Sequence, residues 1–121
     1  MKQLIATMVL TGLLSAPALA DSMGSLIDEA YSLTSIGFDM AEYGSSQSTD
    51  DVVQCMDMMR EHQPKADELR SRITELPFSV AQSNLEMAAI DLRRCLSCIP
   101  DAVSSCEAAE TLIDTSEQYL N

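Results

Sequence analysis

Four cysteines constrain the fold of this 121-residue chain more than any other feature: Cys55, Cys95, Cys98 and Cys106. The apolar residues around them recur every three or four positions, and no sustained alternation of strand type is present, which predicts an all-α protein. Cysteine pairs become disulfides in exported proteins and stay reduced in the cytosol. The fold is therefore expected to hold these side chains on helices and within bonding distance of one another.

The N-terminus predicts export. Lys2 precedes an apolar run over residues 4–14, and the small-x-small site Ala18-Leu19-Ala20 follows. This is the pattern of a secretory signal peptide, here residues 1–20, with cleavage before Asp21. The run spans about 11 residues where a membrane-crossing helix needs roughly 20, and no later stretch is apolar enough, so no membrane span is expected. We expect a periplasmic protein, with full secretion as the alternative.

The composition limits the class of partner. The remaining residues, 21–121, suffice for a single domain. The chain has 19 acidic and 7 basic residues, a net charge of −12, and only one charge, that of Lys2, lies in the predicted signal peptide. A nucleic-acid-binding surface needs basic residues to neutralise phosphates, so no nucleic acid is expected as a partner. The excess of acid favours solubility or a cationic partner.

Four segments carry the helical repeat. The first runs from about Ser22 to Tyr43, and Gly37 within its apolar stripe predicts the close approach of another helix. The second starts near Ser48 and continues in phase through Pro64, which predicts a kink and not an end. The residues expected to face inward are Leu26, Ala30, Leu33, Gly37 and Met40, then Val52, Cys55, Met59, His62, Ala66, Leu69, Ile73 and Leu76, then Phe78, Ala81, Leu85, Ala88, Leu92, Cys95 and Ile99, and finally Ala102, Cys106, Ala109, Ile113 and Leu120.

The short loops between these segments predict an up-down-up-down antiparallel four-helix bundle, because a short loop only lets neighbouring helices run antiparallel. In such a hairpin, residues that lie equally far from the turn face each other. This register favours disulfides between Cys55 and Cys98 and between Cys95 and Cys106, both at one end of the bundle. The alternative, Cys55 with Cys95 and Cys98 with Cys106, shifts each register by one or two residues and stays open, since the sequence does not decide the connectivity.

The segment Cys95-Leu96-Ser97-Cys98 has the C-x-x-C spacing of thiol-disulfide oxidoreductases. Reactive pairs of that kind lie at helix N-termini, where the helix dipole lowers the thiol pKa, whereas this pair lies in the last turn of the third helix. Covalent haem attachment needs a histidine where Ile99 stands. We therefore expect both disulfides to be structural.

A soft-metal carrier is the alternative function. Met56, Met59 and His62 lie within two turns of the second helix and suit copper, while the converging cysteines suit zinc. The competing interpretation is that Met59 fills the core and His62 is an ordinary core residue. A b-type haem protein, with His62 and either Met40 or Met87 as axial ligands, is less favoured, because the likeness to haem-binding bundles is one of architecture alone.

No catalytic motif is present. The single histidine has no partner serine in a G-x-S-x-G context. We expect a non-catalytic binding protein without a cofactor, whose partner is another protein. It is expected to be a monomer or a homodimer, since Tyr31 and Phe38 lie beside the core stripe of the first helix and predict an exposed apolar patch.

Overall fold

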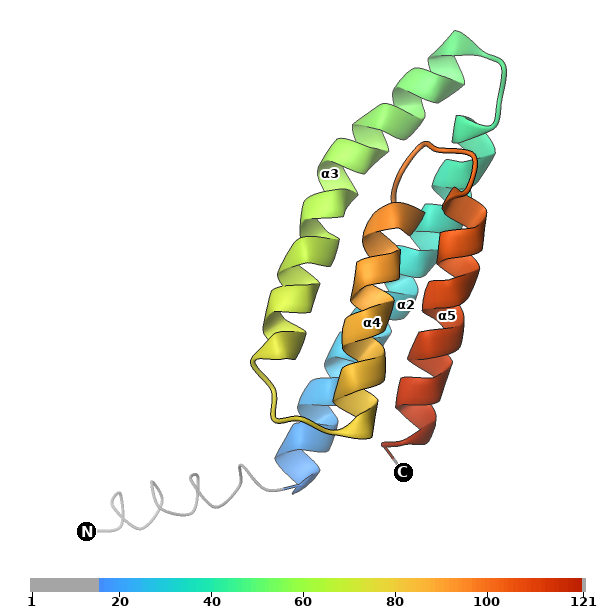
Figure 1. The fold of residues 1–121 in the computed structure, drawn as a ribbon. Helices are drawn as coiled ribbons and strands as arrows, with labels where there is room; N and C mark the ends of the chain where they lie inside the picture. Colours follow the sequence, from blue (N-terminus) through green and yellow to red (C-terminus); the bar gives the residue numbers. More distant parts are fainter. Residues whose placement is uncertain (1–15, 121) are drawn as a thin grey trace, which may run out of the picture.

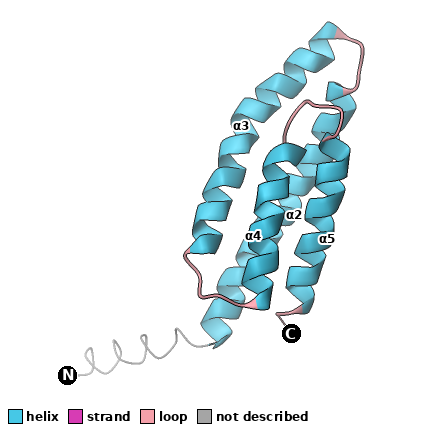
Figure 2. Ribbon diagram, in the orientation of Figure 1, coloured by secondary structure: helices cyan, strands magenta, loops and turns pink. Residues whose placement is uncertain are grey.

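The computed structural model describes residues 16–120, which form four helices joined by short loops (Figure 1). The helices are α2 (Ala16–Gly44), α3 (Thr49–Thr74), α4 (Val80–Cys95) and α5 (Ala102–Gln118). No strand occurs within this range (Figure 2), and none of these helices is long and apolar enough to cross a membrane. Most of the predicted signal peptide, residues 1–15, lies outside the described residues.

Consecutive helices run in opposite directions, so the predicted up-down-up-down bundle is confirmed (Figure 1). Helix α2 packs against all three of the others, whereas α3 and α5 make no contact with each other in the part of the chain described. Of the two diagonal helix pairs, α2 and α4 are therefore in contact, whereas α3 and α5 are held apart. The disulfide-bearing end of the bundle holds the α2–α3 and α4–α5 loops.

Helix α2 buries every residue predicted to face inward, and it buries Ile27 and Thr34 as well. The apolar face is wider than expected because the helix contacts three neighbours and not two. The hydroxyl of Thr34 remains satisfied inside the core, since its Oγ1 donates to the carbonyl oxygen of Ala30 at 2.8 Å.

Helix α3 continues through Pro64, as predicted. Its fully buried residues are Cys55, Ala66, Leu69 and Ile73. The other predicted inward positions, Val52, Met59, His62 and Leu76, are only half-buried. For the three that lie on α3, the reason is that this helix packs against α2 and α4 alone and leaves the rest of its surface in solvent. Leu76 lies beyond the end of the helix.

The prediction that two residues of the third stripe face inward is wrong. Phe78 is 84% exposed and Ile99 is 45% exposed, because α4 is shorter than its heptad pattern. The helix is capped at its start by Ser79, whose Oγ accepts a hydrogen bond from the backbone N–H of Gln82 at 3.0 Å. At its other end, Leu96 leaves the helical conformation with φ −87° and ψ 50°. Both exposed residues lie beyond these ends.

Helix α5 buries four predicted residues, Ala102, Cys106, Ala109 and Ile113. Leu120 is half-buried, beyond the end of the helix. Ser116, which interrupts the apolar stripe in the sequence, is also fully buried. Its Oγ donates to the carbonyl oxygen of Ala81 at 2.7 Å, so a polar side chain joins α5 to the first turn of α4.

Candidate functional site at the disulfide end

The two disulfides connect Cys55 to Cys98 and Cys95 to Cys106, which confirms the favoured connectivity. The Cα atoms are 6.1 Å apart in the first pair and 4.6 Å apart in the second. Three of the cysteines are fully buried, and Cys98 is half-buried. The two cysteines of the C-x-x-C segment thus bond to different helices, α3 and α5, and neither is left as a thiol.

Helix α2 packs directly on both disulfides through two glycines. A Cβ atom added to Gly37 would overlap Sγ of Cys95 and would lie 2.9 Å from Sγ of Cys106. A Cβ atom added to Gly44 would lie 3.3 Å from Sγ of Cys55 and 3.5 Å from Cα of Cys98. Glycines seven residues apart share one face of a helix. The close approach predicted at Gly37 is confirmed, and the same role of Gly44 was missed although the spacing signals it.

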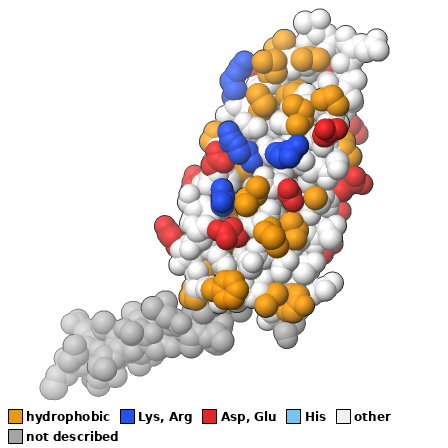
Figure 3. All heavy atoms as spheres, viewed as in Figure 1, with side chains coloured by type: hydrophobic (Ala, Val, Ile, Leu, Met, Phe, Trp, Pro, Cys, Tyr) orange, Lys and Arg blue, Asp and Glu red, His pale blue; other side chains and the backbone are white. Residues whose placement is uncertain are grey.

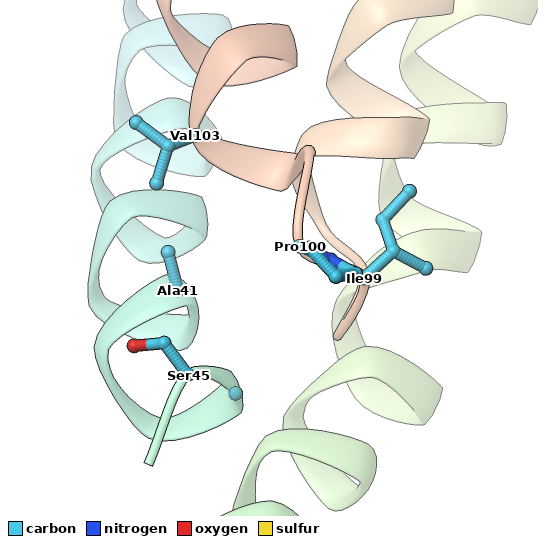
Figure 4. Close-up of a pocket in the computed structure, with 6 residues that line it drawn as sticks. Ala41, Ser45, Ile99, Pro100 and Val103 are labelled. Atoms are coloured by element: carbon cyan, nitrogen blue, oxygen red, sulfur yellow. The ribbon is translucent and has the colours of Figure 1, made fainter.

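A cleft opens beside these contacts, where the end of α2 meets the α4–α5 loop and the start of α5 (Figure 4). Its volume is about 420 Å³. The lining residues are Ala41, Gly44, Ser45, Ile99, Pro100 and Val103. Ile99 and Val103 keep 45% and 42% of their surface exposed, so the cleft carries apolar side chains that the core does not cover.

The lining offers little reactive chemistry. Ser45 contributes the only side-chain hydroxyl, and it donates to the carbonyl oxygen of Glu42 at 3.3 Å. No acid, histidine or cysteine side chain lines the cleft. Its surface suits the binding of an apolar group and holds no pair of groups for acid-base chemistry.

The soft-metal candidates lie elsewhere, along the middle of α3. Met56 is exposed, Met59 is half-buried, and the side chain of His62 is 12% exposed. Nδ1 of His62 is buried and has no hydrogen-bond partner among the described residues, while Nε2 lies 3.7 Å from Oε2 of Glu61. Since all the cysteines are in disulfides, the soft-metal hypothesis rests on these three side chains and stays a prediction.

Charge divides the bundle into two sides. Helices α2 and α5 carry five and four acidic residues and no Lys or Arg. The basic residues of the described chain all lie on α3 and α4, and Figure 3 shows Lys and Arg over these helices. The ion pairs follow the same division: each one uses a cation of α3 or Arg93 of α4. The α2–α5 side is therefore acidic and supplies no Lys or Arg of its own, and among the described residues the one ion pair that reaches it joins Arg72 of α3 to Glu29 of α2.

Tyr31 joins the two acidic helices. Its hydroxyl donates to Oδ1 of Asp114 and lies 3.3 Å from Oε1 of Glu117. Tyr31 and Phe38 are half-buried and pack against the core, so the exposed apolar patch predicted from these two residues is wrong. The pKa of Tyr31 is raised above its ordinary value, first by burial and then by the hydrogen bond and charge of Asp114.

This raised pKa predicts an alkaline loss of stability. The folded protein favours the neutral phenol, so the contribution of Tyr31 is fully present below about pH 10 and is lost as the pH rises further. We expect the free energy of unfolding to fall above about pH 10 more steeply in the wild type than in Tyr31→Phe, as measured by urea denaturation across that range. Tyr119→Phe, at an exposed tyrosine, serves as the control and should keep the wild-type slope. Equal slopes in all three proteins would contradict the assignment.

In the part of the chain described, no cluster of three or more His, Cys, Asp or Glu side chains is arranged to hold a metal ion. The feature that distinguishes the disulfide end is thus the cleft, built on two cross-links and two glycine contacts. The chain matches no family model, no curated protein and no solved structure.

Proposed function

We propose that this chain is an exported, non-catalytic binding protein of the periplasm that captures a partner protein at its disulfide end. The observation that carries the proposal is the apolar cleft between the end of α2, the α4–α5 loop and Val103. Exposed apolar side chains beside a concave surface are typical of interaction sites. The predicted signal peptide and the two disulfides support export, because disulfides persist in oxidising compartments.

The rigidity of this end also supports binding. Gly44 lines the cleft and packs against the Cys55–Cys98 disulfide. The opposite wall begins directly after Cys98, and Cys106 ties the first turns of α5 to α4. A surface that is held in place before it meets its partner loses little conformational entropy on binding. The cross-links therefore favour a preformed docking site over a loop that orders on contact.

A photo-activated cross-linking residue placed at position 45 tests the proposal. Ser45 is exposed and lines the cleft, so illumination of intact cells should yield a discrete adduct between this protein and another periplasmic protein. The matched control carries the same cross-linker at Glu68, an exposed position on α3, and should not give that adduct.

Two further results complete this test. The Val103→Asp variant, which puts a charge into the cleft, should lose the adduct at position 45 while keeping its fold. Identical adducts from positions 45 and 68, or none from either, would contradict a binding site at the disulfide end. If the protein is recovered only from the culture medium, the proposed periplasmic location is wrong and the protein is fully secreted.

A further inference from the structure

The charge distribution around the cleft indicates the chemistry of its partner. Glu42 follows Ala41 in the α2 wall, and Asp101 follows Pro100 in the loop wall. Both acids are exposed, and neither has an ion-pair partner among the described residues. Each of the two chain segments that form the walls thus carries an exposed acidic residue directly after a lining residue.

Side chains, and not helix dipoles, determine the sign of the electrostatic potential at the cleft. The C-terminal end of α2 carries partial negative charge, and the N-terminal end of α5 carries partial positive charge. The two ends meet at the cleft, so their dipoles oppose each other. The formal charges remain, and both helices that border the cleft are acidic without a single Lys or Arg.

The size of the cleft limits what enters it. A volume of about 420 Å³ accommodates a few aliphatic side chains of a peptide but not a folded element such as a whole helix. Apolar contact inside and carboxylates at the border together fit a segment that presents branched aliphatic side chains flanked by Lys or Arg. A negatively charged segment would meet repulsion on both sides.

We propose that the cleft binds a cationic, aliphatic peptide segment of a partner protein, with the aliphatic side chains against Ile99 and Val103 and the basic side chains beside Glu42 and Asp101. This inference rests on the proposed binding function and adds the class of ligand. Electrostatic attraction accelerates the encounter, and burial of the aliphatic side chains supplies the affinity that lasts at physiological salt.

Three short fluorescein-labelled peptides test the proposal with the purified, disulfide-bonded protein: a Leu/Lys peptide, a Leu/Glu peptide and a Ser/Lys peptide of equal length. Fluorescence anisotropy at low and at physiological salt measures each affinity. We expect the Leu/Lys peptide to bind at least about tenfold more tightly than either of the others. Only this peptide offers both aliphatic side chains for the apolar residues of the cleft and basic side chains for Glu42 and Asp101.

Variants assign the binding to the cleft. Ile99→Ser/Val103→Ser removes apolar contact and should weaken the Leu/Lys peptide about tenfold at both salt concentrations. Glu42→Gln/Asp101→Asn should weaken it about threefold at low salt and less at physiological salt. The controls Val53→Ser and Glu68→Gln change an exposed apolar and an exposed acidic residue of α3, and they should leave the affinity unchanged.

Each other outcome overturns the inference in a recognisable way. Equal binding of the Ser/Lys peptide would show attraction to the acidic surface without use of the cleft. Preferential binding of the Leu/Glu peptide, lost in Ile99→Ser/Val103→Ser, would keep the cleft and refute the charge argument. No peptide binding together with the position-45 adduct would refute the ligand class and leave the proposed function standing, whereas loss of both refutes both. Self-association in sedimentation, abolished by the same cleft variant, would make a second copy the occupant.

Discussion

Replacing both cysteines of the Cys55–Cys98 bridge by alanine is expected to lower the free energy of unfolding by about 4 kcal/mol. The bridge joins residues 43 positions apart, so its loss returns a large conformational entropy to the unfolded chain. The Cys95–Cys106 bridge spans 11 positions and should contribute about 3 kcal/mol by the same argument. Both of its sulfurs are fully buried, so their removal adds the cost of a cavity.

Losses of this size are a large part of the roughly 5–15 kcal/mol that is typical for a single domain. Urea denaturation followed by circular dichroism measures them, without and with reductant. Reductant should destabilise the wild type and leave the variant that lacks all four cysteines unchanged. A cost below about 1 kcal/mol for both double variants would contradict the prediction, since the helices would then dock equally well without cross-links.

The second large effect is expected at Gly37. In Gly37→Ala the new Cβ overlaps Sγ of Cys95 and lies 3.2 Å from its carbonyl oxygen. Neither atom can move freely, because the disulfide and the end of α4 hold them. We expect the free energy of unfolding to fall by about 2–3 kcal/mol, since overpacking outweighs the better helix propensity of alanine. The midpoint of thermal unfolding should fall by roughly 10–20 °C.

Two other glycines of α2 supply matched controls. Nothing lies within 4 Å of a Cβ at Gly24, so Gly24→Ala should stabilise the protein by about 0.5–1 kcal/mol through helix propensity. Gly44→Ala places its Cβ 3.3 Å from Sγ of Cys55 and should fall between the other two. The predicted order of stability is therefore Gly24→Ala, then Gly44→Ala, then Gly37→Ala. A different order would refute the packing argument.

Combining the two predictions separates their mechanisms. When Cys95 and Cys106 are both alanine, the sulfurs that obstruct a Cβ at Gly37 are gone. Gly37→Ala should then cost at least about 1 kcal/mol less than in the wild type, a coupling that a double-mutant cycle measures. An equal cost in both backgrounds would mean that Gly37 is needed for a reason other than contact with the disulfide.

The features that could be predicted from sequence follow from local periodicity. Apolar spacing of three and four identified all four described helices, and short loops required them to run antiparallel. Register then favoured the observed cysteine pairs over the alternative, because distance from a turn indicates which residues of a hairpin are level. Phe78 and Ile99 were misplaced for a related reason: a heptad pattern does not contain the helix ends, which Ser79 and Leu96 determine.

The sequence by itself thus determined the helical class, the topology and the excess of acid, since each depends on spacing along the chain or on composition. It favoured the observed cysteine pairing, and the structure decided between the two pairings that were left open. Only the tertiary structure decided that Gly44 packs on a disulfide, that α2 and α5 form one acidic side, and that Ser45 and Val103 border one cleft. These features join residues far apart in the chain. They arise because helix packing brings together side chains whose separation no local repeat encodes.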